Sequence, residues 1–235
     1  MPSPLLLSVN VGLPRELPPP PKGWRGDPPW RSRMSGIFKE PVAGAVWVGA
    51  TNLAGDAQAD RKNHGGADKS VNVYSADHFP DWRLRLDRPD LTSGAFGENF
   101  TVAGLDEETV CIGDIFAIGD VRVQVTQPRQ PCWKLARKWD VKDLVVQVEE
   151  LHRTGWYLRV LHEGHVEAGL PITLLERPHP EWTIARAYAT MRARHDDPAT
   201  AAALAACPAL SEDWQKSLVA PPKPTKRAAP KRGVA

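Results

Sequence analysis

The chain has 235 residues, of which 42% are hydrophobic and 25% charged, the composition of a globular protein with a sizeable core. Its formal net charge is +2, but residues 216–235 carry six basic side chains and no acid; subtracting these six leaves −4 for residues 1–215. This distribution argues against a fold whose body coats nucleic acid.

The chain has three isolated cysteines, Cys111, Cys132 and Cys207, which cannot build a disulfide framework. Because they form no C-x-x-C pair, a zinc site built from thiolates is also excluded. The N-terminus lacks the basic region of a signal peptide, and no apolar run approaches the roughly 20 residues of a membrane helix. We therefore expect a cytoplasmic protein with no membrane partner.

Short apolar, β-branched runs dominate the first 175 residues. Segment 18–33 is too rich in proline for a helix or a central strand, and is expected to lie on the surface. Gly119-Asp120 separates two apolar runs and predicts a hairpin. Helices are predicted at Ala76–Leu86, with Ser75 as the N-cap, and at Val141–Leu151. The predicted strands are Leu5–Val11, Val42–Val48, Ser70–Tyr74, Phe116–Ile118, Val121–Val125, Tyr157–Leu161 and Ile172–Leu175.

This pattern predicts a mainly β fold, a closed or nearly closed barrel with a few helices, over residues 1–180. After Pro180 the pattern changes to helical spacing, and three short helices are expected at Trp182–Arg194, Ala199–Ala206 and Ser211–Leu218. Residues 181–220 would form a small helical subdomain. The basic, proline-rich residues 221–235 would be a disordered tail.

The polar segment 55–69 is the first candidate site. The backbone amides of Gly65-Gly66 can approach an anion closely, Lys69 can add a positive charge, and His64 can contact a ligand. A surface loop with a Gly-Gly turn is the competing interpretation, and spacing alone favours it.

The segment Gly94–Thr101 is the second candidate. Asn99 offers both a donor and an acceptor, which suits recognition of a heterocycle edge. The alternative is a glycine-bulged strand whose Phe96 and Phe100 pack in the core, and the two interpretations can both hold.

The segment Thr126–Leu135 is the third candidate, because two prolines hold Cys132 at a fixed place after a strand. Arg129 and Lys134 bracket the thiol, and nearby cations favour a thiolate, which is a nucleophile and a soft-metal ligand. The alternative is a small buried hydrophobe, the interpretation we favour for Cys111 and Cys207.

In order and spacing, these three segments resemble the MOSC domain, the module named for the C-terminus of molybdenum cofactor sulfurase, and most closely its bacterial YiiM-type branch with three added helices. The resemblance implies a β-barrel that binds molybdenum cofactor, a pterin dithiolene carrying molybdenum. It implies Cys132 as the metal ligand and catalytic residue. The implied cofactor-binding residues are Gly65, Gly66, Lys69, Asn99, Arg129 and Gln130. The family also carries an expectation of pyridoxal phosphate binding.

The branch implies reduction of N-hydroxylated compounds, such as 6-hydroxylaminopurine, to amines, with His64, or Asp56 through water, as the proton source. A separate reductase would supply electrons, and a homodimer is compatible with the sequence. One alternative is a sulfur carrier that uses a Cys132 persulfide. A second, disfavoured, is a nucleic-acid-binding module that uses the basic tail.

Overall fold

The computed structural model describes residues 3–20, 22, 24 and 33–222. The predictions for the basic tail from residue 223 and for most of the proline-rich segment lie outside these residues. An eight-stranded sheet, in the order β12-β8-β9-β10-β6-β7-β1-β4, forms the body of the protein. Its strands are β1 (Leu5–Val11), β4 (Glu40–Pro41), β6 (Val71–Ser75), β7 (Phe100–Ala103), β8 (Ile115–Ile118), β9 (Val121–Pro128), β10 (Trp156–His162) and β12 (Thr173–Glu176). Two small ladders pair β2 (Arg15–Glu16) with β3 (Met34–Ser35), and β5 (Val46–Val48) with β11 (Gly164–Val166).

The sheet curls until its two ends almost meet. The Leu6 N–H donates to Leu170 O at 2.9 Å, and the Gly169 N–H donates to Leu6 O at 2.7 Å. Residues 169–172 directly precede β12, at the opposite end of the sheet from β1 and β4. These bonds satisfy backbone groups of an edge that would otherwise stay open. The predicted mainly β, nearly closed barrel is therefore confirmed.

The predicted hairpin is present as β8 and β9, with Ile118 paired to Val121 across a turn in which Gly119 has a φ of +55°. Val121, Val123 and Val125 are buried while Arg122 is exposed, the alternation of a strand with one face on the core. β9 runs three residues further than predicted, to Pro128, and so delivers the next residue, Arg129, to the end of the sheet.

Six short helical segments surround this end of the sheet. They are α1 (Arg61–His64), η1 (Ala67–Lys69), η2 (Ala76–His78), α2 (Phe79–Leu86), α3 (Trp133–Trp139) and α4 (Leu144–Glu150). Ser75 accepts a hydrogen bond from the Asp77 N–H, which confirms the predicted cap. The sequence did not predict α1 or α3, since both lie in segments interpreted as loops. Asp60 caps α1 by accepting from the Asn63 N–H at 3.1 Å, and α3 begins directly after Cys132.

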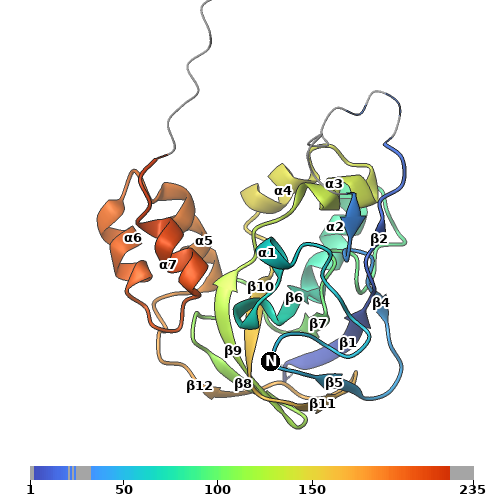
Figure 1. Ribbon diagram of the computed structural model, residues 1–235, viewed down its shortest axis with the longest axis horizontal. Helices are drawn as coiled ribbons and strands as arrows, with labels where there is room; N and C mark the ends of the chain where they lie inside the picture. The colour runs from blue at the N-terminus through green and yellow to red at the C-terminus, as the bar shows by residue number, and fades with distance from the viewer. Residues whose placement is uncertain (1–2, 21, 23, 25–32, 223–235) are drawn as a thin grey trace, which may run out of the picture.

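The C-terminal helices are α5 (Ile184–Ala193), α6 (Pro198–Ala205) and α7 (Glu212–Leu218), capped by Thr183, Asp197 and Ser211. In Figure 1 they gather on one side of the molecule, and α2, α3 and α4 lie on the other side. The apolar faces of these helices belong to the same core cluster as strand residues of the barrel. The three-helix subdomain is therefore docked on the barrel, as predicted.

Two details differ from the prediction. Of the expected strand Val42–Val48, only Val46–Val48 is a strand, because Gly44 turns the chain with a φ of +78°. Cys111 is buried as expected, but it makes a single bridge to Thr183 instead of lying in a strand. In the part of the chain that the structure describes, no helix has the length and apolarity to cross a bilayer.

Candidate active-site cleft

A cleft at the end of the sheet brings together side chains from all three candidate segments. It spans about 630 Å³, a volume that includes space open to solvent. Five of the predicted site residues line it: His64, Lys69, Asn99, Arg129 and Cys132. The other three do not. Gly65 and Gly66 line a neighbouring hollow, and Gln130 is exposed outside the cleft.

Cys132 occupies the N-cap of α3 and is half-buried in the cleft wall. Its carbonyl accepts the Leu135 N–H at 2.9 Å, so the first turn of α3 holds the backbone that carries the thiol. Cys111 and Cys207 are buried in the core, where desolvation raises the pKa of each thiol. Of the three cysteines, Cys132 is the one placed to reach a ligand in the cleft.

Two buried polar atoms in the cleft wall have no hydrogen-bond partner among the residues that the structure describes. Arg129 is 5% exposed and its Nη1 is unpartnered; Asn72 is 7% exposed and its Oδ1 is unpartnered. Leaving such an atom unsatisfied costs about 1–3 kcal/mol, more for a charged group. The wall is therefore built to receive hydrogen-bonding atoms from something other than the protein.

A buried ion pair forms another part of the wall. Asp56 accepts hydrogen bonds from Lys39 Nζ, from the Gly12 N–H at 2.9 Å and from Asn99 Nδ2 at 3.0 Å. Burial lowers the pKa of Lys39, and the adjacent carboxylate of Asp56 opposes that shift. The sequence pointed to Asp56 but not to Lys39, because nothing in the local sequence indicates that this lysine side chain is buried.

Both polar groups of the Asn99 amide are hydrogen-bonded within the protein. Its Oδ1 accepts the Asn72 N–H at 3.1 Å, and its Nδ2 donates to Asp56 Oδ2 and, at 3.2 Å, to Asn10 O. The nearby Phe96 and Phe100 are fully buried, as the structural alternative predicted. We conclude that Asn99 fixes Asp56 and the start of β6, while the amide that faces the cleft with a free oxygen is that of Asn72.

Positive charge exceeds negative charge along the cleft. Lys39, Lys69, Arg129 and Lys134 line it, against Asp56 and Asp60. Lys134 Nζ donates to Met34 O at 2.6 Å, whereas Lys69 Nζ donates to Asn63 O at 3.2 Å and pairs with Asp213 at 2.9 Å. A concave surface with surplus buried cations favours an anionic ligand.

His64 lies among these cations. Burial is the largest influence on its imidazole and repulsion from Arg129 the next, and together they lower its pKa to about 4. The imidazole is therefore neutral at pH 7 in the ligand-free cleft, and in that state it is not the proton reservoir that the sequence analysis expected.

This shift has a measurable effect on stability. In the unfolded chain His64 binds a proton near pH 6.5, but in the folded protein it does so only near pH 4, so acidification between these values favours unfolding. Between pH 7 and pH 4.5 we expect wild type to lose about 2–3 kcal/mol more unfolding free energy than His64→Gln. Urea denaturation of cofactor-free protein at both pH values measures this, and equal losses would contradict the assignment.

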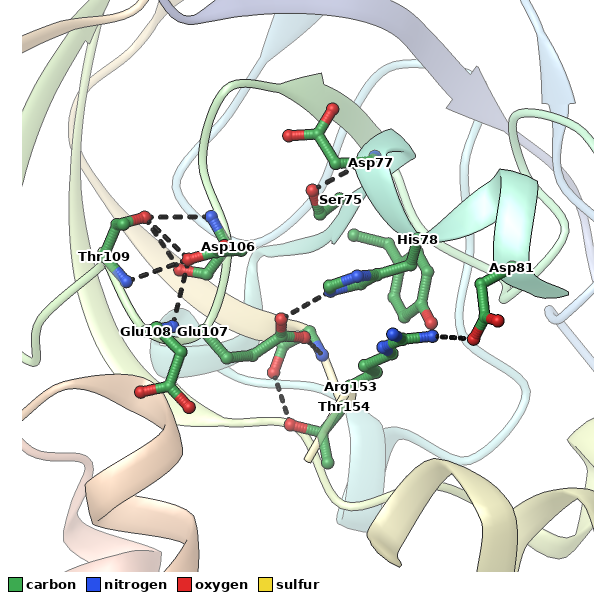
Figure 2. A network of polar contacts seen from close by, with 12 residues as sticks. Ser75, Asp77, His78, Asp81, Asp106, Glu107, Glu108, Thr109, Arg153 and Thr154 are labelled. Atoms are coloured by element: carbon green, nitrogen blue, oxygen red, sulfur yellow. Dashed lines mark hydrogen bonds and ion pairs between the residues drawn. The ribbon is translucent and has the colours of Figure 1, made fainter. Parts of the chain in front are cut away.

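A polar network on the far side of Arg129 holds its backbone. The Arg129 N–H donates to Gly155 O at 2.9 Å, and the Gly155 N–H donates to Glu107 Oε1 at 2.7 Å. Figure 2 shows the side chains of Glu107 and His78 pointing toward each other, with 2.7 Å between Oε2 and Nε2. Gly155 has a φ of +73°, and a Cβ there would lie 2.3 Å from Val73 O. Only glycine fits between the network and β6.

The three-helix subdomain also touches the cleft. Asp213 of α7 pairs with Lys69, and Ser211 Oγ donates to Gln127 Oε1 of β9 at 2.6 Å. Within the described residues, no group of three or more His, Cys, Asp or Glu side chains is arranged to hold a metal ion.

Comparison with known proteins gives the family. The MOSC domain model matches residues 60–173, and the model of the YiiM-like 3-alpha helix domain matches residues 182–220. The uncharacterized protein YflK of Bacillus subtilis is 44% identical over 91% of this chain and 92% of its own. A protein named reductase from Gibberella moniliformis is 40% identical over 68% of this chain and 29% of its own length.

The structural neighbours agree. The crystal structure of YiiM from Geobacillus stearothermophilus superposes with a TM-score of 0.76 at 37% identity, over 92% of this chain and 100% of its own. The crystal structure of YiiM from Escherichia coli superposes with a TM-score of 0.68 at 25% identity, over 92% of this chain and 91% of its own. The chain therefore belongs to the MOSC-domain family, among the members that carry the YiiM-like three-helix domain.

Proposed function

We propose that this protein is a molybdenum-cofactor-dependent reductase that converts N-hydroxylated compounds, such as hydroxylaminopurine bases, to amines. The observation that carries the proposal is the cleft that both Cys132 and Arg129 line, with Arg129 Nη1 unpartnered among the described residues. The MOSC family is associated with this cofactor, and one relative is named reductase.

The residues present fit such a cofactor. Cys132 offers the soft thiolate ligand that molybdenum accepts, and the cofactor's dithiolene would complete the metal's coordination. Arg129 and Lys69 would supply positive charge for the anionic groups of the cofactor. Lys69 is the better placed of the two for a terminal phosphate, since its side chain lies by the exposed α1 and α7.

The reaction removes one oxygen: R–NHOH, two electrons and two protons give R–NH₂ and water. The bound cofactor would supply the two-electron change. The protein's own task is to orient the substrate and move protons. An anionic ligand would offset the repulsion that Arg129 and Lys134 exert on His64, and its pKa would rise toward the range of a proton donor at neutral pH. The Lys39 ammonium, paired with Asp56, is a second proton carrier on the cleft wall.

The anionic contacts can be tested by substitution. A charge-assisted contact contributes about 1.5–3 kcal/mol, so Arg129→Ala and Lys69→Ala should each weaken cofactor binding by about one to two decades. The measurement is molybdenum per chain in protein from a cofactor-competent host. Arg122→Ala on β9 and Lys62→Ala on α1 are matched controls, since both side chains are exposed outside the cleft. Full occupancy in both cleft variants would remove these residues from the binding site.

The proposed function itself is tested on the full-length wild-type protein. We expect stoichiometric molybdenum and pterin, and reduction of 6-hydroxylaminopurine once a chemical or enzymatic reductant is supplied. A Cys132 persulfide without molybdenum would instead support the sulfur-carrier alternative. Absence of both would refute both functions.

A further inference from the structure

We infer that Asn72, together with Arg129, recognises one edge of a nitrogen heterocycle bound in the cleft. Asn72 Oδ1 would accept an N–H from the ring edge, and Arg129 Nη1 would donate to an acceptor beside it. The inference rests on the proposed function in one respect: it concerns the same cleft. It adds the chemical class of the group that this part of the wall contacts.

The orientation of the Asn72 amide follows from its neighbours. Nδ2 donates to Gly97 O at 3.0 Å, and this bond directs the NH₂ group to the backbone and leaves Oδ1 as the unpaired atom. Asn72 lies in the middle of the buried strand β6, between Val71 and Val73. A buried polar side chain costs free energy unless its polar atoms are hydrogen-bonded. The unpaired Oδ1 is therefore suited to accept a hydrogen bond from a ligand.

The sheet places Arg129 and this amide on either side of β10. Tyr157 of β10 is paired with Asn72 on one side and with Gln127 of β9 on the other. Arg129 follows β9 by one residue and lies against the Tyr157 hydroxyl, whose pKa burial raises. Asn72, Tyr157 and Arg129 all line the cleft. An unpaired acceptor and an unpaired donor therefore belong to the same cleft wall, with Tyr157 of β10 between them.

This arrangement discriminates between ligand groups. A phosphate or carboxylate presents acceptors alone at neutral pH, so it would satisfy Arg129 and leave Asn72 Oδ1 facing another oxygen. A ring edge with an amino or ring N–H beside a ring nitrogen or carbonyl oxygen satisfies both atoms. Both the pterin of the cofactor and an aminopurine substrate present such an edge, so the experiment must separate these two sources.

The test uses Asn72→Ala in the full-length protein from a cofactor-competent host, with two readouts besides turnover. The first is pterin and molybdenum per chain. The second is the Kd for adenine relative to unsubstituted purine, which lacks the amino group, measured by calorimetry. If Asn72 reads the cofactor ring, we expect about a tenfold weaker retention of pterin. If it reads the substrate base, pterin content stays and the preference for adenine falls about tenfold.

Asn10→Ala is the matched control, since Asn10 is a buried asparagine whose side chain bonds to Ser8 and Thr101 and does not line the cleft. It should lower the melting temperature without changing either readout. If Asn72→Ala does not fold, Asn72→Ser provides the same comparison with a shorter side chain that cannot reach the ligand.

The two hypotheses fail in different ways. If the wild-type protein purifies without pterin and molybdenum, the proposed function is contradicted. The comparison of the Kd values for adenine and purine then decides the inference alone. The inference is overturned if the wild-type protein carries a full complement of pterin and molybdenum and the Asn72→Ala variant equals it in pterin content and in preference for adenine over purine.

Discussion

Replacing Cys132 with serine should lower molybdenum content by at least about tenfold and abolish reduction of hydroxylaminopurine, because a hydroxyl is a poor ligand for a soft metal. The fold should be unaffected. The side chain is half-buried in the cleft wall, and it occupies the N-cap of α3, a position where serine is favoured. Metal analysis and a thermal melt on the same preparation separate loss of the ligand from loss of the structure.

Cys111→Ser and Cys207→Ser are the controls for this prediction. Both thiols are buried in the core, so serine there exchanges a small hydrophobic group for a hydroxyl and lowers stability, whereas molybdenum content should stay at the wild-type level. A Cys132→Ser protein that retains near-full metal and turnover would show that the metal has another ligand.

Removing the C-terminal helices should have the largest effect on stability. Truncation after Pro180 deletes α5, α6 and α7, and with them the Trp182, Tyr188 and Trp214 side chains that complete one core cluster with the barrel. It also deletes Asp213 and Ser211, which contact Lys69 and Gln127. Exposed apolar strand residues should then make the truncated protein insoluble or strongly destabilised.

Truncation after Ala220 is the matched experiment. Residues beyond Val219 offer no apolar face to bury, so their loss should leave the melting temperature and activity unchanged. Fractionation after expression and thermal melts compare the two truncations. A soluble protein ending at Pro180 with wild-type stability would show that the helices do not serve this fold.

Local pattern was enough for much of the architecture. The alternation in Val121–Val125 and the turn at Gly119-Asp120 predicted the β8–β9 hairpin, and the cap Ser75 marked where a helical segment begins. These features depend on a residue's own side chain and its near neighbours. The helices α1 and α3 were missed because both are short and lie in segments interpreted as loops. Part of the stability of α3 is supplied by contacts made elsewhere in the fold. Three α3 cations, for example, bond to distant backbone carbonyls: Lys134 to Met34, Arg137 to Pro18 and Lys138 to Gly94.

The sequence by itself indicated which segments meet at the cleft, since Cys132, His64, Lys69 and Arg129 do line it. Only the tertiary structure decided how each group is used. Asn99 lost its expected role because distant partners, Asp56 and Asn10, occupy its amide. His64 became neutral because folding buries its imidazole and also places it beside cations that lie up to 70 residues away in sequence. Whether a polar group is already hydrogen-bonded, and which charges repel it, depends on which atoms are close in space. Strand pairing across the barrel determines those contacts.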